Sequence, residues 1–226
     1  KVVLAELFEA TPCLTALRLR DGSVRWRTPI DLSAFHHSIY MSGSDGTLVL
    51  TGSRHDTVGD RKLIQYRVIG VDAATGAERW RNDNTPTFAH VLNGGHGEQT
   101  QHPAIVGNTV YGPGFARDLH TGEAPDVWIW HKSPQCATLS AGRHCAFSRQ
   151  NGKPTIASFA SGKADHLTTV SRPGCWINTL PAGGVVLIPE ASSGCTCGYS
   201  VQTTLALHPV NPHHPAKQTA ADAAAE

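Results

Sequence analysis

The sequence lacks an excess of charge of either sign. Its 226 residues include 19 basic and 18 acidic side chains, for a formal net charge of +1. Domains that bind nucleic acid or an anionic membrane surface through charge are strongly basic, so we expect neither partner. No apolar run approaches the ~20 residues of a membrane-spanning helix, and no signal segment opens the chain at Lys1. We therefore expect a mature or excised globular chain without membrane insertion.

Several motifs that are typical of a particular chemistry are also missing. The chain has no phosphate-binding GxxxxGK[ST] loop, no nucleophile elbow, no CxxC pair and no CxxCH haem-attachment motif. Apolar residues at a sustained helical spacing of 3.6 are missing as well. Phosphate-loop chemistry and Ser/His/Asp hydrolysis are therefore set aside, and helices have almost no support.

Turn-forming residues are abundant by contrast. The 22 glycines and 14 prolines are scattered along the chain between short apolar runs, which favours many turns joining short strands. We predict strands near residues 2–4, 14–17, 46–53, 64–72, 105–106, 110–111, 116–119, 137–139, 145–148, 156–159, 176–180, 185–188 and 203–207.

One stretch, VIGVDAATGAERWR at residues 68–81, contains a complete hairpin. Gly76 can adopt the positive φ of a tight turn, and Asp72 or Thr75 can hydrogen-bond the turn backbone. Trp80 then supplies a large apolar ring that a neighbouring unit must cover. The stretch is therefore expected to form the outer edge of a larger unit.

The same pattern of a turn glycine and a following tryptophan recurs, in whole or in part, along the chain. Gly22 and Trp26 lie 54 residues before Gly76 and Trp80, Gly122 lies 46 residues after Gly76, and Gly162 lies 40 residues after Gly122. Repeats of this length with three or four short strands are typical of β-propeller blades. We predict an all-β protein at residues 1–209, a propeller of about five four-stranded antiparallel blades that is either complete or part of a larger ring, followed by a flexible tail at 210–226. A β-sandwich is the structural alternative.

The repeated D-A-A-T-G-x-x-x-W-R, echoed by residues 21–27 and 118–122, resembles the pyrroloquinoline-quinone-type repeat of quinoprotein-like β-propellers. The resemblance implies that each tryptophan packs between adjacent blades. The later segments look like the C-terminal region of large bacterial secreted proteins that carry such propellers. Quinoprotein dehydrogenases have seven or eight blades and adjacent paired cysteines, whereas this chain has Cys195-Thr196-Cys197. The resemblance therefore does not imply the quinone cofactor, and fold alone does not give function.

The densest polar cluster is NGGHGEQTQH at residues 93–102. It carries His96, Glu98, Gln99 and His102 in a glycine-rich loop, a donor set that suits a divalent cation of unknown identity. His36 and His37, near Tyr40, precede the preceding unit's strand and could converge on the same channel mouth. The alternative is that these histidines hydrogen-bond the backbone or face solvent.

Six cysteines are present, an even number that suits disulfides in an oxidising compartment, secreted or periplasmic. The candidates for pairing are Cys136, Cys145, Cys175, Cys195 and Cys197. A soft-metal or redox site at the Cys195–Cys197 pair is the competing interpretation.

These observations favour an extracytoplasmic binding or scaffold module whose partner is a polysaccharide or another protein domain or copy. The alternative is a metal-dependent enzyme acting on polysaccharide by lyase or oxidative chemistry, in which a histidine or tyrosine removes a proton beside a uronate. Some polysaccharide lyases with propeller folds resemble this chain in residue types only. Arg117, Arg143, His144 and Arg172 are present, without assignable roles. A quinone-dependent dehydrogenase is a third and weaker interpretation.

Overall fold

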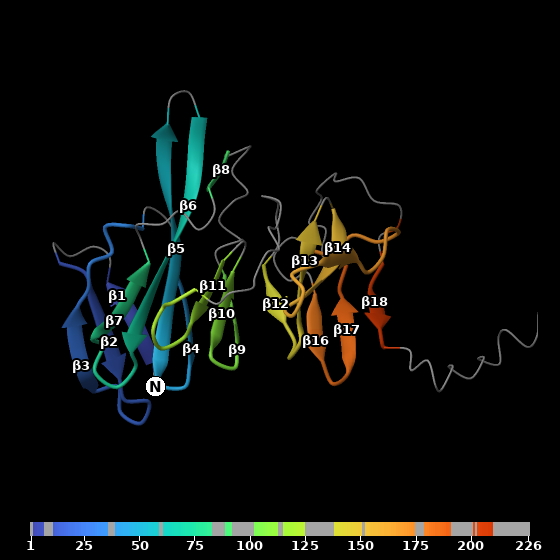
Figure 1. Ribbon diagram of the computed structural model, residues 1–226. Coiled ribbons are helices and arrows are strands. Elements are labelled where there is room, and N and C mark those ends of the chain that lie inside the picture. The colour runs from blue at the N-terminus through green and yellow to red at the C-terminus, as the bar shows by residue number, and fades with distance from the viewer. Residues whose placement is uncertain are drawn as a thin grey trace, which may run out of the picture.

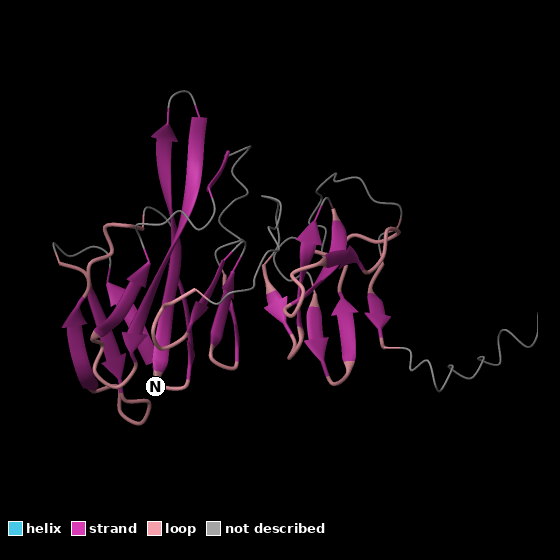
Figure 2. Cartoon of the chain, viewed as in Figure 1, coloured by secondary structure: helices cyan, strands magenta, loops and turns pink. Residues whose placement is uncertain are grey.

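The computed structural model describes residues 2–6, 11–35, 39–58, 61–82, 89–91, 102–112, 115–124, 138–150, 152–174, 179–190, 201 and 203–209. Regular structure in these residues is all β (Figure 2). Within them no helix is long and apolar enough to cross a membrane. The predicted all-β class is confirmed.

The strands form five antiparallel sheets, which we number in chain order. Sheet 1 contains β1 (Val2–Glu6), β2 (Cys13–Leu17) and β3 (Val24–Pro29). Sheet 2 contains β4 (Tyr40–Ser44), β5 (Thr47–Val58), β6 (Arg61–Asp72), β7 (Glu78–Asn82) and β8 (Ala89–Val91). Sheet 3 contains β9 (Ala104–Val106), β10 (Thr109–Gly112) and β11 (Phe115–Asp118).

Sheet 4 contains β12 (Ser140–Ala141), β13 (Cys145–Gln150), β14 (Lys153–Ser158) and β15 (Ala164–His166). Sheet 5 contains β16 (Leu180–Ala182), β17 (Val185–Ile188) and β18 (Leu205–Leu207). The sheets follow one another across the molecule, from β3 at one side to β18 at the other (Figure 1). Five consecutive sheets match the five predicted units, and they differ from the two packed sheets of a sandwich.

Several details differ from the sequence prediction. β4 was not expected, because residues 40–44 carry no apolar alternation. β5 and β6 each run for 12 residues and project beyond the rest of sheet 2 (Figure 1). The strand expected at 137–139 instead begins at Ser140. In the described residues, moreover, only sheet 4 has the four strands that were predicted for each unit.

The inner sheets have apolar side chains on both faces. Successive residues of a strand point to opposite sides, and apolar residues occupy both sets of positions. In sheet 2, Leu50 and Ile69 are opposite one another and face a core shared with Leu14 of sheet 1. The next residue along β5, Val49, belongs to a second core with Val110 of sheet 3. Sheet 2 therefore packs between sheets 1 and 3.

A single turn design recurs in sheets 1 to 4. The residue that opens the turn donates its N–H to the carbonyl five positions later and accepts from the N–H of the glycine four positions later. These glycines all have positive φ: Gly22 at 71°, Gly76 at 80°, Gly122 at 75° and Gly162 at 64°. The predicted turn positions are therefore confirmed.

In the second turn the Asp72 carboxylate accepts from the backbone N–H groups of Ala74 and Thr75 at 2.8 and 2.9 Å. The Thr75 hydroxyl accepts from Ala77 N–H at 3.2 Å. Asp118 caps the third turn in the same way. Asp72 and Thr75, the side chains predicted to hydrogen-bond the turn backbone, therefore do so.

Tryptophans join consecutive sheets, as the repeat implied. The ring of Trp26 in sheet 1 lies against Gly76 in the turn of sheet 2, and the ring of Trp80 in sheet 2 lies against Gly122 in the turn of sheet 3. A Cβ added to Gly122 would stand 2.6 Å from Cδ2 of Trp80. Glycine is therefore required at both turns for its missing side chain as well as for its φ.

The second joint is also hydrogen-bonded. Trp80 is 8% exposed, and its Nε1–H donates to the carbonyl of Leu119 at 3.0 Å. Gly70 is directly opposite Trp80 on β6 and makes room for the indole ring. At the first joint, the Thr28 hydroxyl donates to the Thr75 carbonyl at 2.8 Å.

Candidate functional site

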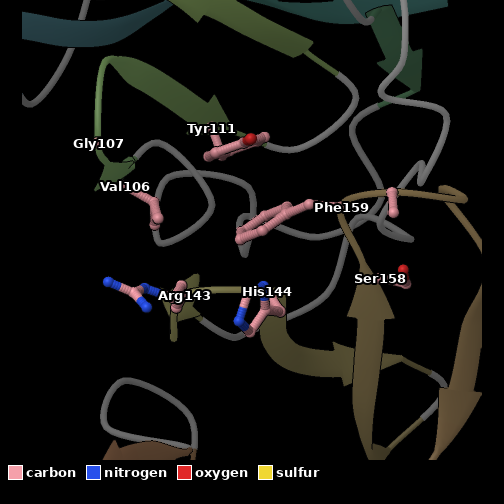
Figure 3. Close-up of a pocket in the computed structure, with 8 residues that line it drawn as sticks. Val106, Gly107, Tyr111, Arg143, His144, Ser158 and Phe159 are labelled. Carbon is pink, nitrogen blue, oxygen red and sulfur yellow. The ribbon is translucent and has the colours of Figure 1, made fainter.

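The described residues enclose an open groove of about 640 Å³ between sheets 3 and 4. It is formed by the β9–β10 turn, by β10, by the β12–β13 turn and by the turn after β14 (Figure 3). The residues that line it are Val106, Gly107, Tyr111, Arg143, His144, Ser158, Phe159 and Ala160. Its volume lies within the roughly 300–1,000 Å³ of ligand pockets.

The groove has an aromatic wall. Phe159 stacks on Tyr111 with ring centroids 3.9 Å apart and an interplanar angle of 19°. Both rings pack on the small core of sheets 3 and 4, which includes Leu139 and Ala146. In Figure 3 Phe159 lies between Tyr111 and His144. The wall is therefore fixed from behind by the sheet-to-sheet interface.

The turn that carries Phe159 is also fixed by its backbone. Phe159 donates its N–H to the carbonyl of His144 at 3.1 Å, and Gly162 donates to the carbonyl of Ser158 at 2.9 Å. Gly142 closes the opposite turn by donating to the carbonyl of Cys145 at 2.9 Å. The two turns of sheet 4 that line the groove are therefore tied together before any ligand binds.

The polar groups at the groove are cationic or neutral. Arg143 and His144 are exposed at its edge, whereas Phe159 is half-buried. No Asp or Glu is among the lining residues, so an anion placed there meets no carboxylate of the lining. A guanidinium can bind a carboxylate through two parallel hydrogen bonds. The groove is therefore suited to an anionic ligand with an apolar or planar face.

The predicted histidine site is described only in part. His102 is half-buried; its Nδ1 lies 3.1 Å from the carbonyl oxygen of Pro103. Tyr40 stands edge-on to this imidazole with ring centroids 5.4 Å apart. The structure therefore brings Tyr40 beside His102, and the channel mouth stays a prediction. His36, His37, His96, Glu98 and Gln99 lie outside the described residues.

The metal site consequently stays a prediction. Across the part of the chain that the structure describes, no group of three or more His, Cys, Asp or Glu side chains could hold a metal ion. Cys145 is a free thiol whose pKa is raised by burial, and Cys13 is free as well. The other disulfide candidates, Cys136, Cys175, Cys195 and Cys197, lie outside the described residues, so their pairing is still a prediction.

A polar network between sheets 2 and 3 was not anticipated. The His120 imidazole lies 3.2 Å from a carboxylate oxygen of Asp45 through Nε2, and 3.3 Å from the Thr47 hydroxyl through Nδ1. Arg79 also donates to the Thr47 hydroxyl, at 2.6 Å. This order of Asp, His and Thr is reminiscent of a hydrolytic triad, but Thr47 is only 1% exposed and is occupied by Arg79. The network is therefore a link between sheets.

From the sequence, no role was assigned to Arg143 and His144, and Val106, Tyr111 and Phe159 were expected only as strand residues. The groove residues come from two segments that are more than 30 residues apart, and no local pattern connects them. One signal was present in the sequence. Phe159 follows Ser158, the first residue of the fourth turn, and the residue in the same position of the third turn is Leu119, which is buried.

The geometry defines an all-β protein of serially packed antiparallel sheets with a cationic, aromatic groove. No protein-family model matches the chain, and no curated protein does. Nineteen chains of solved structures are similar to it. One of them is described as a europium-containing methanol dehydrogenase, with 13% sequence identity and a TM-score of 0.32; the match covers 83% of this chain and 59% of the dehydrogenase chain. That likeness is too remote to bear on either the fold or the function.

Proposed function

We propose that the chain forms a β-propeller that serves as a binding module outside the cytoplasm. The tryptophan joints support the propeller, because both have the same design: the tryptophan of one sheet lies on the turn glycine of the next. Repetition of one such step arranges sheets around an axis. An experimental structure with the sheets arranged radially around a channel is the expected result, and an open stack without an axis would contradict it. The support for the location is the even number of cysteines alone.

The groove between sheets 3 and 4 is its binding site, and the ligand is an acidic saccharide. The observation that carries this proposal is the pairing of a fixed aromatic wall, Phe159 on Tyr111, with Arg143 and His144 at the edge. A uronate has both complementary parts: a carboxylate for the guanidinium, and an apolar ring face that can lie on an aromatic side chain. Loops at sheet ends commonly carry such sites on a rigid scaffold.

Calorimetry with an oligogalacturonate and with its methyl ester tests the site. We expect the free acid to bind and the ester, which has no carboxylate, to bind at least tenfold more weakly. Arg143→Gln should weaken binding of the acid by a similar factor, because it removes the charged donor. Arg25→Gln is the matched control, since Arg25 is an exposed arginine on β3, far from the groove in the chain.

The two ligands also distinguish recognition of the carboxylate from nonspecific binding. Equal binding of acid and ester by the wild-type protein would contradict an anion site. Equal losses in Arg143→Gln and Arg25→Gln would show that only overall positive charge matters. Phe159→Leu, which keeps an apolar side chain but no ring, should lower affinity for both ligands if the aromatic wall contributes.

A further inference from the structure

The turn of sheet 1 has the backbone of the two turns that receive tryptophan rings. Arg18 donates to the carbonyl of Ser23 at 2.8 Å and accepts from Gly22 N–H at 2.8 Å. Asp72 and Asp118 make the corresponding pairs of bonds in the turns of sheets 2 and 3. We call each such turn, with the surface over its glycine, a seat. Sheet 1 therefore presents a third seat of the same design.

The seat of sheet 1 is open, whereas those of sheets 2 and 3 are filled. Trp26 lies on Gly76 and Trp80 lies on Gly122, but no atom of the described residues lies within 4 Å of a Cβ built on Gly22. Each filled seat faces the preceding sheet in the chain, because its tryptophan comes from that sheet. By the same polarity, the open seat faces away from sheet 2.

The side chain at the rim of the open seat is exposed. Leu19 is the residue after the turn's first position, which is the place of Leu119 in the third turn. Leu119 is 0% exposed beneath Trp80, whereas Leu19 is 73% exposed. Val24, at the start of β3, is 54% exposed as well. The same position is therefore buried where a neighbouring sheet is present and open where none is.

The other end of the series has an exposed apolar face. Leu180 and Leu187 are directly opposite one another on β16 and β17, and they are 44% and 37% exposed. Ala206 is opposite Leu187 on β18 and is exposed too. The other face of this sheet carries Ile188, which is fully buried. Sheet 5 thus has one covered and one open face.

Four of the exposed large apolar side chains that the structure describes, Leu19, Val24, Leu180 and Leu187, belong to sheets 1 and 5. The other two are Val170 and Val201, and none of the six belongs to sheets 2 to 4. Serial assemblies of repeats need polar outer faces at their ends to stay monomeric. Apolar ends that continue an established series of interfaces are association surfaces.

We propose that the open seat of sheet 1 receives the exposed face of sheet 5 from a second copy of the chain. The second copy is the partner because sheet 5 ends the series that sheet 1 begins, so its exposed face has the polarity of the internal joints. Leu180 and Leu187 would cover the seat that a tryptophan ring covers at the internal joints. Figure 1 shows sheets 1 and 5 at opposite sides of the molecule. The contact joins two different surfaces, so copies associate head to tail in a ring or an open chain.

Sedimentation velocity over a range of protein concentrations tests this proposal. The mass of the wild-type chain should rise above the 24.1 kDa of the monomer. Leu19→Glu and Leu187→Glu should each be monomeric at every concentration, because each variant has lost one of the two surfaces. Lys163→Glu is the matched control, an exposed substitution in the fourth turn that should leave association unchanged. Circular dichroism checks that all variants fold.

Mixing the two variants distinguishes this contact from a symmetric one. Leu19→Glu retains the sheet 5 face and Leu187→Glu retains the seat, so an equimolar mixture should form a dimer that grows no further. A mixture that stays monomeric would overturn the proposal. So would a monomeric wild-type chain, or continued association of Leu19→Glu alone through two sheet 5 faces. The groove is not involved in any of these measurements.

Discussion

Trp80 is the side chain on which the joint between sheets 2 and 3 depends. Its indole covers Gly122 and donates to the buried Leu119 carbonyl. Trp80→Ala removes the packed ring and leaves that carbonyl without its donor. We expect the free energy of unfolding to fall by about 3–5 kcal/mol, measured by urea unfolding.

Trp80→Phe separates packing from hydrogen bonding at the same position. Phenylalanine keeps much of the ring but has no N–H, so the loss of the hydrogen bond alone should cost about 1 kcal/mol. A loss with Trp80→Ala no larger than with Trp80→Phe would show that the ring does not hold the joint.

Asp72 makes the stability of the second turn depend on pH. The hydrogen bond from Arg79, with Nη2 2.5 Å from the carboxylate, is the largest cause that lowers the pKa of Asp72 from 3.8 to about 2; backbone N–H donors add to it. A pKa that is lower in the folded than in the unfolded protein gives stability that is full above the unfolded value and is lost on acidification. Unfolding midpoints in urea should therefore drop between pH 3.8 and about 2.

Asp72→Asn removes this titration, so its midpoint should change less over the same interval. Arg79→Gln should flatten the curve as well, because it removes the main cause of the low pKa. Identical curves for Asp72→Asn and the wild type would exclude Asp72 as a source of the acid sensitivity.

At the scale of the element, the recurring turn has two separable requirements for glycine. Gly22 and Gly122 have nearly the same positive φ, 71° and 75°, but only Gly122 lies beneath a tryptophan. Alanine costs of order 1–3 kcal/mol for its φ at either position. At Gly122 it must also displace Trp80, which adds about 1–3 kcal/mol.

Gly22→Ala and Gly122→Ala therefore form a matched pair. We expect the Gly122 variant to be the less stable of the two in thermal and urea unfolding, measured at a concentration where the chain is monomeric. Equal losses of stability in the two variants would mean that the Trp80 ring moves aside at no cost in free energy and that the joint is not tightly packed.

The turns and their spacing were predictable because the information is local. Asp72, Thr75, Gly76 and Trp80 lie within nine residues, and each has a conformational or packing role of its own. The long β5–β6 hairpin was only partly predicted, because its outer half is polar and has no apolar alternation to mark it. β4 was missed for the same reason: its pairing with β5 fixes it, rather than its own composition.

At the scale of the whole molecule, each sheet contacts its neighbours in sequence, and the cores are formed between consecutive sheets. This is why the fold class could be predicted while the groove could not. The sequence contains a repeated unit and a tryptophan that must be covered, which together imply serial packing. The groove depends on how the turns of sheets 3 and 4 meet, and Arg143 and Phe159 carry no pattern that predicts their meeting.

The fixed joint between tryptophan and glycine also bears on how such a chain changes over evolutionary time. Because the ring comes from one sheet and its glycine seat from the next, every sheet with both features has compatible surfaces in front and behind. Duplication or loss of a whole sheet at such a joint preserves the surrounding contacts, whereas a break inside a sheet destroys two cores. The heritable module is therefore the stretch from one seat glycine to the next, and the chain's length can change by that unit.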